Sequence, residues 1–410
     1  MTDPFLPAPG APAAAQGGHD FPQRLVAPAP TLFVAAAAKR RRLAPWLIGT
    51  GVVALIAAIS GGTQLATNLG YDDAEEHLVS AAEYQNDAAM TLGAVVDDAT
   101  EVTGAAGGIL DYGTGAVLSA DELAPLRTDL EETTAVLDDA QRLAGTETPT
   151  ASGKPFWAWE LSAAAAELRD DADDADAIAE EMATMREDLQ GEVDGLGTLG
   201  SDLLTQAAGR AADIEQELPS AENESILQLR STADALADAS SSLDDDAQAA
   251  FKAFDDAVVA ARSSYQAELD SKAGPLLETR LEVEDYARTL APGVLMDFDW
   301  SVLVNGLGVG GWLSGQTWWH YDRGGYATIE LSDSVAEQWP SAATQALVAH
   351  EVGHAITVKC RDLYDDSDQG TIEAWATAWA ISMGFTDPGN GTSAYGAPSQ
   401  EMIDLAATCR

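Results

Sequence analysis

The sequence has few basic residues and almost no cysteine, and both shortages exclude classes of protein. Its 410 residues hold 21 Lys and Arg against 67 Asp and Glu, a formal net charge of −46. A field of this sign repels phosphate backbones, so we expect no nucleic-acid partner. Two cysteines, Cys360 and Cys409, are too few for a disulfide scaffold or a four-cysteine zinc module. They could still form one disulfide in an oxidising compartment.

Length and composition predict two or three folded units, at a prior of roughly 150 residues per domain. Residues 1–42 are rich in Pro, Ala and Gly and end in Lys39, Arg40, Arg41 and Arg42. This composition cannot bury enough apolar surface to offset the entropy of ordering. We therefore expect a disordered cytoplasmic tail with a basic stop.

Residues 43–65 contain a strongly apolar run, with basic residues before it and acidic residues from Asp72 after it. A run of this kind is close to the roughly 20 residues that cross a bilayer. The sequence therefore predicts one transmembrane helix. The positive-inside rule then predicts a single-pass protein of the cell membrane, with a cytoplasmic N-terminus and an extracytoplasmic C-terminal domain. A cleaved signal peptide and a buried core helix are the alternatives.

Residues 72–290 are dominated by Ala, Asp, Glu and Leu, and apolar positions recur at three and four residues. That period is typical of amphipathic helices. Breaks near 111–115, 145–155 and 218–220 divide the segment into about four long helices. We expect an acidic, all-α bundle or coiled-coil stalk. Its acidic face is interpreted as solvated, and a helical partner or self-association is the alternative.

Residues 291–410 contain seven of the ten tryptophans, so a tight globular core is expected there. Glycine-punctuated, β-prone stretches predict three short strands, at Ser301–Val304, Trp312–Tyr321 and Tyr326–Leu331. Pro and cap residues then predict three helices, at Ser341–Val358, Ile372–Met383 and Ser399–Cys409. The predicted fold class is an α+β domain with a short β-sheet and then helices, preceded by the helical stalk and the transmembrane helix.

The first of these three helices carries His350, Glu351 and His354 in an H-E-x-x-H arrangement. Histidines four residues apart lie on one face of a helix, so both imidazoles can reach one zinc ion. Glu351 is then placed to take a proton from a water molecule at the metal. A catalytic zinc also needs a third protein ligand. Glu373, eighteen residues after His354, is the best candidate, and an ordinary acidic residue near a helix N-terminus is the alternative.

An H-E-x-x-H followed by eighteen residues and a Glu resembles the gluzincin group of zinc metallopeptidases. The layout of a sheet followed by helices is similar to the minigluzincin-like members, and the resemblance covers about the last 120 residues. The metzincin pattern is excluded, because Thr357 and Cys360 stand where it needs Gly and His or Asp. One departure from the gluzincin pattern is Thr377, where many members carry an acidic residue that hydrogen-bonds a zinc histidine.

The resemblance implies peptide hydrolysis with one zinc ion per chain, Glu351 as general base and a peptide or protein substrate. It also implies that the strand Tyr326–Leu331 lies along the cleft and pairs with the substrate. An oxyanion-stabilising residue is expected, for which Tyr364, Tyr395 and His320 are candidates and packing or surface roles are the alternative.

Two further expectations complete this interpretation. A disulfide between Cys360 and Cys409 would tie the end of the H-E-x-x-H helix to the end of the last helix. The helical segment is long for a spacer, so it could cover the catalytic cleft. The alternative function is a non-enzymatic cell-surface protein with a partner-binding helical region and a degenerate or structural zincin domain.

Overall fold

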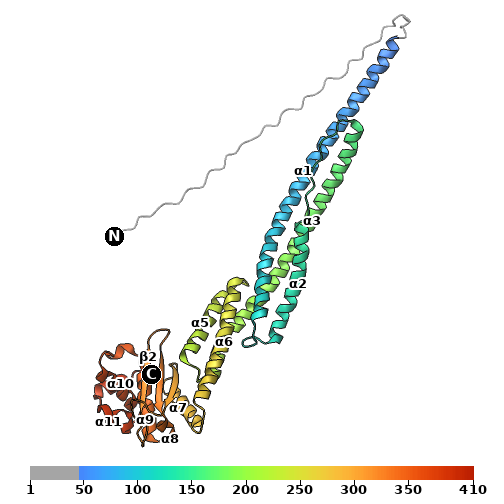
Figure 1. The fold of residues 1–410 in the computed structure, drawn as a ribbon. Coiled ribbons are helices and arrows are strands. Elements are labelled where there is room, and N and C mark those ends of the chain that lie inside the picture. The colour runs from blue at the N-terminus through green and yellow to red at the C-terminus, as the bar shows by residue number, and fades with distance from the viewer. Residues whose placement is uncertain (1–45) are drawn as a thin grey trace, which may run out of the picture. The chain divides into compact units, whose positions relative to one another are not determined.

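The computed structural model describes the chain from Trp46 to its end, with side chains described from residue 58 onward. Its contacts divide the chain into two units, Met1–Leu65 and Ala66–Arg410. The elements of the second unit follow one another from long helices to a small sheet and then to short helices (Figure 1). The predicted disordered tail over residues 1–42 lies outside the described residues.

Helix α1 (Trp46–Tyr112) covers most of the predicted transmembrane segment and continues without a break beyond it. Within the described part of the chain, no helix is long and apolar enough to cross a membrane. This finding contradicts the predicted transmembrane helix over 43–65, and with it the predicted single-pass membrane localisation. The reason lies in composition, because Gly, Thr, Gln and Asn follow Ser60 in the helix and acidic residues follow from Asp72. Residues 43–45 and the side chains of 46–57 lie outside the described part.

Within the described residues, the helical segment of the second unit consists of seven helices of very different length, the first of which begins before residue 66. After α1 come α2 (Ala120–Ala144), α3 (Ala158–Gly209), α4 (Ala211–Glu217), α5 (Asn223–Ala239), α6 (Asp245–Ser271) and α7 (Leu277–Leu290). Three of the junctions fall close to the predicted breaks, whereas those at 210, 240–244 and 272–276 were not predicted, so the expected four helices are seven. From residue 66 on, α1 lies beside α2 and α3, and alanines fill much of the space between the helices (Figure 1). Small side chains allow the helix backbones to approach one another closely.

A three-stranded sheet follows the helices, formed by β1 (Leu295–Ser301), β2 (Gly315–His320) and β3 (Tyr326–Ser332). The strand order is β1-β3-β2, with β3 parallel to β1 and antiparallel to β2. The predicted first strand, 301–304, is therefore wrong, because the strand ends where that prediction begins. The predicted pairing of Tyr326–Leu331 with a substrate is also wrong, because both edges of β3 are already paired. The edge strand next to it is β2.

The core around the sheet is built from β1, β3 and the helices that cover them. Met296 and Phe298 of β1 and alternate residues of β3 are buried. They pack against α9 (Ala342–Ala355) and α10 (Gln369–Ser382), whose Trp375 and Trp379 are fully buried. Val283 of α7 belongs to the same core, which therefore begins before residue 291. The remaining short elements are α8 (Asp333–Glu337), η1 (Ile356–Lys359), η2 (Arg361–Leu363), η3 (Pro388–Asn390), α11 (Thr392–Tyr395) and α12 (Gln400–Ala406).

These elements correct the predicted fold class. The described chain is mostly helical with one small sheet, and it lacks the transmembrane helix that the predicted class included. Local signals still placed the helix starts well. The predicted starts at Ser341 and Ser399 are right to within one residue, because these serines cap α9 and α12, whereas α10 begins before the predicted Ile372, because Asp368 caps it.

Candidate metal centre

Helices α9 and α10 bring the three predicted metal ligands together. His350 and His354 lie on one face of α9, and Glu373 faces them from α10. The two helices can approach because residue 353 is glycine, and a Cβ there would lie 2.7 Å from the carbonyl oxygen of Ala376. His350 Nε2 lies 3.2 Å from His354 Nε2 and 3.2 Å from Glu373 Oε2, and His354 Nε2 lies 3.4 Å from the same oxygen. Three potential ligand atoms therefore surround one point.

A neighbouring loop fixes the orientation of the His350 ring. Nδ1 of His350 lies 3.1 Å from the backbone carbonyl oxygen of Asn390 and 3.3 Å from the hydroxyl of Thr377. A carbonyl oxygen only accepts hydrogen bonds, so this contact places the proton of a neutral imidazole on Nδ1. Nε2 then presents a lone pair toward His354 and Glu373. The carbonyl of Asn390 and the hydroxyl of Thr377 thus orient the His350 ring.

The lone pair on His350 Nε2 limits what can lie between His350, His354 and Glu373. The carboxylate of Glu373 accepts hydrogen bonds and cannot donate to Nε2 when it is ionised. The negative oxygen and the nitrogen lone pair, 3.2 Å apart, repel one another unless a proton or a metal cation lies between them. His350 and His354 are buried and the Glu373 side chain is 12 % exposed, so water screens this repulsion only in part.

The spacing of the ligand atoms fits zinc. A tetrahedral zinc ion with ligand bonds of about 2.0–2.1 Å places neighbouring ligand atoms about 3.3–3.4 Å apart. The three separations here are 3.2, 3.2 and 3.4 Å. Two imidazoles and one carboxylate are also the donor set of several catalytic zinc sites, which keep the fourth position open. The residues present therefore fit this metal.

The charge state of Glu373 suits the same role. Burial by itself would raise the pKa of Glu373, but a proton shared with His350 or His354 stabilises the carboxylate and holds the pKa well below its usual range. Its second oxygen accepts a hydrogen bond of 2.8 Å from the side chain of Gln369. The carboxylate is therefore ionised at neutral pH and fixed by neighbours on both oxygens.

Glu351 lies beside the ligands, at the wall of a cavity of about 520 Å³. The side chain is 4 % exposed, and its Oε2 accepts a hydrogen bond of 2.8 Å from the hydroxyl of Thr317 on β2. Residue 315, also on β2, is glycine, and a Cβ there would lie 2.5 Å from Glu351 Oε1. The strand β2 thus fixes the carboxylate in place. The cavity is lined by Asn305, Gly315, Gln316, Thr317, Trp318, Trp319, His320, His350, Glu351, His354, Gln369, Ile372, Glu373 and Tyr395.

Two of the three predicted oxyanion-stabilising candidates lie at this cavity. The Tyr395 ring stacks on His350, with 5.7 Å between ring centroids. Burial and the nearby carboxylates of Glu373 and Glu351 raise the pKa of Tyr395 to about 12, so its hydroxyl can donate a hydrogen bond at neutral pH. His320, the last residue of β2, also lines the cavity, and its ring stacks on Tyr326.

Tyr364, the third candidate, does not line the cavity. Its ring stacks on Trp375, and its hydroxyl bonds to that of Thr357 at 3.0 Å. It therefore has a packing role. A residue that sequence reasoning missed is Trp319, whose indole lies parallel to the His354 ring with 5.7 Å between centroids. Asn390 was also missed, although its place in an Asp-Pro-Gly-Asn-Gly turn is a local signal of a tight loop.

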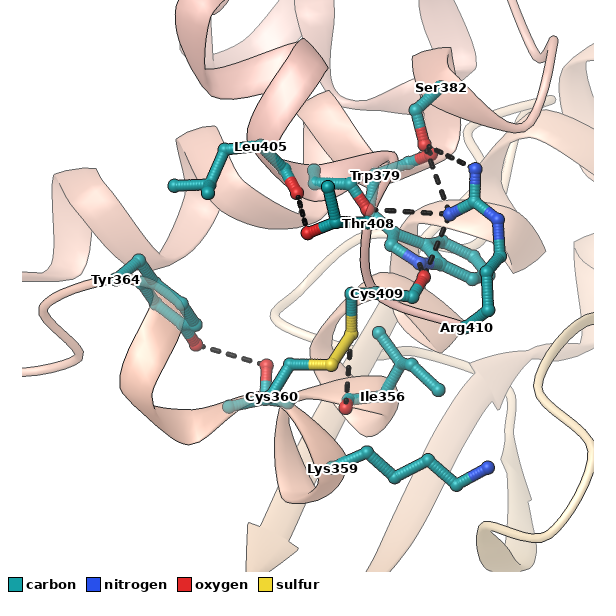
Figure 2. The surroundings of a disulfide bond; sticks show 12 residues. Ile356, Lys359, Cys360, Tyr364, Trp379, Ser382, Leu405, Thr408, Cys409 and Arg410 are labelled. Carbon is teal, nitrogen blue, oxygen red and sulfur yellow. Dashed lines mark hydrogen bonds between the residues drawn. A yellow bond between two sulfur atoms is a disulfide. The ribbon is translucent and has the colours of Figure 1, made fainter.

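The predicted disulfide is confirmed, with Cys360 bonded to Cys409 (Figure 2). Cys360 follows the end of η1, directly after the helix that carries the two histidines. The backbone carbonyl of Cys409 accepts a hydrogen bond of 3.0 Å from the indole of Trp379 on α10. The chain end is thereby fastened to both helices that hold the candidate ligands.

Comparison of the chain with family models, with curated proteins and with solved structures finds no match. The resemblance to gluzincins therefore rests on His350, Glu351, His354 and Glu373 themselves. The chemistry of the site has to be argued from its own geometry.

Proposed function

We propose that this protein is a zinc-dependent hydrolase of peptide bonds, with His350, His354 and Glu373 as metal ligands and Glu351 as general base. The observation that carries the proposal is the Nε2 lone pair of His350, held toward an ionised carboxylate at a spacing that matches a tetrahedral zinc ion. Such an arrangement needs a proton or a metal cation between its members. The adjoining cavity leaves room for a substrate.

The role of Glu351 follows from its position and its one hydrogen bond. Bound zinc would supply a Lewis acid that polarises the scissile carbonyl group and lowers the pKa of water. Glu351 would take the proton from the attacking water and deliver it to the leaving amine. The Thr317 hydroxyl holds one carboxylate oxygen of Glu351 during this transfer. Tyr395, protonated at neutral pH, would donate to the carbonyl oxygen as negative charge develops on it.

The cavity supports internal peptide bonds as the substrate class. Among the described residues that line it, none is Lys or Arg. A free C-terminal carboxylate would therefore meet Glu351 and Glu373 without a cationic side chain to bind it. The strand β2 lines the cavity and is an edge strand, so an extended peptide could add to it by backbone hydrogen bonds. These features favour an endopeptidase.

The test is to compare zinc content and peptide hydrolysis in the full-length protein and three variants. After dialysis against metal-free buffer we expect about one zinc per chain in the parent. Glu351→Gln should keep the zinc and lose hydrolysis, whereas His354→Ala should lose both. Glu401→Gln, an exposed residue of α12, is the matched control and should behave as the parent.

Two results would contradict the proposal. If folded parent protein accepts no zinc on titration, the partner-binding, non-enzymatic alternative is favoured. If Glu351→Gln hydrolyses peptides as fast as the parent does, Glu351 is not the general base.

A further inference from the structure

One stretch of this acidic chain carries no charged side chain. Residues 301–320 contain no Asp, Glu, Lys or Arg, although the chain as a whole has 67 acidic and 21 basic residues. The stretch comprises the loop between β1 and β2 and the whole of β2.

The apolar side chains of this stretch are largely exposed to solvent. Their exposed fractions range from 43 % for Trp318 to 65 % for Trp312. Single exposed apolar residues are common on protein surfaces, but a group of them on one short segment marks an interaction site. We call this group the apolar loop surface, and its members are Val302, Leu303, Leu307, Val309, Trp312 and Trp318.

The loop is held in a defined conformation. Asn305 and Gly306 have φ angles of 51° and 77° and form a tight turn, closed by backbone hydrogen bonds of 2.8 and 2.9 Å between Val304 and Leu307. At its far end, the hydroxyl of Ser334 donates to the carbonyl oxygen of Trp312 at 2.7 Å. Exposure of the apolar side chains is therefore a property of an ordered loop.

The loop is also fixed in its middle. A Cβ at residue 308 would overlap the carbonyl oxygen of Val302 and lie 2.9 Å from the Cβ of Ser332, so only glycine fits where the loop folds down onto the sheet. Ser332 also accepts a hydrogen bond of 3.0 Å from the backbone of Ser314. The loop is thus fastened to β3, the central strand that β2 pairs with.

The apolar loop surface is continuous with the candidate active site. Trp318 belongs to this surface and also lines the cavity, and Asn305 at the tip of the turn lines it as well. Within the described residues, β2 pairs with β3 along one edge and with no strand along the other. A molecule that enters the cavity along β2 therefore passes over the apolar loop surface.

We propose that the apolar loop surface binds an apolar stretch of an extended polypeptide substrate, next to the bond that is cleaved. This assignment rests on the proposed function for the identity of the cavity. A polypeptide fits better than a lipid surface for two reasons. The unpaired edge of β2 offers backbone hydrogen bonds that a peptide can use. The net charge of −46 repels anionic head groups.

The experiment measures binding separately from hydrolysis. Full-length protein carrying Glu351→Gln is titrated against two fluorescein-labelled 12-residue peptides, and fluorescence anisotropy gives the affinity. One peptide alternates Leu and Val with Ser, and the other carries Thr and Gly in place of Leu and Val. We expect the apolar peptide to bind at least about tenfold more tightly than the polar one.

The loop variant combines Val309→Ser with Trp312→Ser, and the matched control combines Val259→Ser with Trp159→Ser, which are exposed residues of α6 and α3. The loop variant should lose about tenfold in affinity for the apolar peptide, and the control should lose none. In protein that retains Glu351, the same loop substitutions should raise KM for the apolar peptide and leave kcat unchanged.

Three results would overturn the proposal. They are equal binding of the two peptides, equal affinities of the loop variant and the parent, or binding to phosphatidylcholine vesicles that depends on the loop while peptide binding does not. Because the Glu351→Gln protein binds without cleaving, failure here alongside hydrolysis by the parent refutes only the apolar loop surface. Loop-dependent binding without any hydrolysis by the parent refutes only the proposed function.

Discussion

Replacing Gly391 by Ala tests whether the loop at Asn390 positions His350, the proposed metal ligand. Gly391 has a φ of +99° and lies against the His350 ring. A Cβ there would overlap the hydroxyl oxygen of Thr377 and lie 2.6 Å from His350 Nδ1. The loop or the imidazole must therefore move, and the hydrogen bond from Nδ1 to the Asn390 carbonyl is the contact that such a movement breaks.

The size of the effect can be worked out from two separate contributions. Placing Ala at a positive φ costs about 1–2 kcal/mol of folding free energy. Loss of the hydrogen bond that orients a metal-binding histidine typically weakens metal affinity by about 10–100-fold. That loss corresponds to about 1.4–2.7 kcal/mol of binding free energy. We expect Gly391→Ala to show both losses.

Gly396→Ala is the matched control, because Gly396 has a φ of +87° and no atom lies within 4 Å of a Cβ built there. It should lose similar folding stability and keep the zinc affinity of the parent. Folding stability is measured by urea unfolding of metal-free protein, and zinc affinity by competition with a chromophoric chelator. Equal zinc affinities of the parent and Gly391→Ala would refute the claim that this loop orients His350.

Three further predictions concern stability and are measured by urea unfolding. Cys360→Ser opens a disulfide that spans 49 residues, which should lower the free energy of unfolding by up to about 4 kcal/mol; an unchanged stability would contradict this. Lys272→Met should lower the free energy of unfolding by about 3 kcal/mol, because it leaves the fully buried Glu284 with only Arg288 as a charged partner; an unchanged stability would contradict this. Burial raises the pKa of Asp297 in the folded protein, so the unfolded chain releases this proton at a lower pH than the folded chain does. The free energy of unfolding therefore falls as pH rises through the folded pKa. Asp297→Asn should lessen this fall, and equal pH slopes of the parent and the variant would disprove the prediction.

The ligand residues could be predicted from the sequence because their geometry is local. Residues four apart on a helix always share a face, so His350 and His354 converge wherever that helix forms. Glu373 lies in the second turn of α10, which packs along α9. The Asn390 carbonyl could not be found in the same way, because a backbone oxygen forty residues away leaves no pattern of residue types around His350.

The first strand was predicted at the wrong place because the residue types of both the predicted and the actual segment are misleading. Val302 and Leu303 look like a strand but are exposed in the loop after β1. The actual strand contains Asp297 and Asp299, which read as polar and turn-forming. Asp297 is tolerated there because the backbone N–H of Asn223 on α5 donates to its carboxylate at 2.9 Å. The hydrogen bond that stabilises Asp297 in the strand therefore comes from a residue 74 positions away in the sequence.

The same residue, Asn223, connects the helical segment to the sheet. The side chain of Asn223 also donates to the carbonyl oxygen of Ala327 on β3, and Glu224 pairs with Arg323 in the turn between β2 and β3. All residues that line the cavity lie between Asn305 and Tyr395, so none comes from α1–α7. The start of α5 thus holds the β2–β3 hairpin, which carries Thr317 and one member of the apolar loop surface, Trp318. The helical segment therefore contacts the site's surroundings both at this hairpin and through α7, whose Val283 packs in the same core as α9.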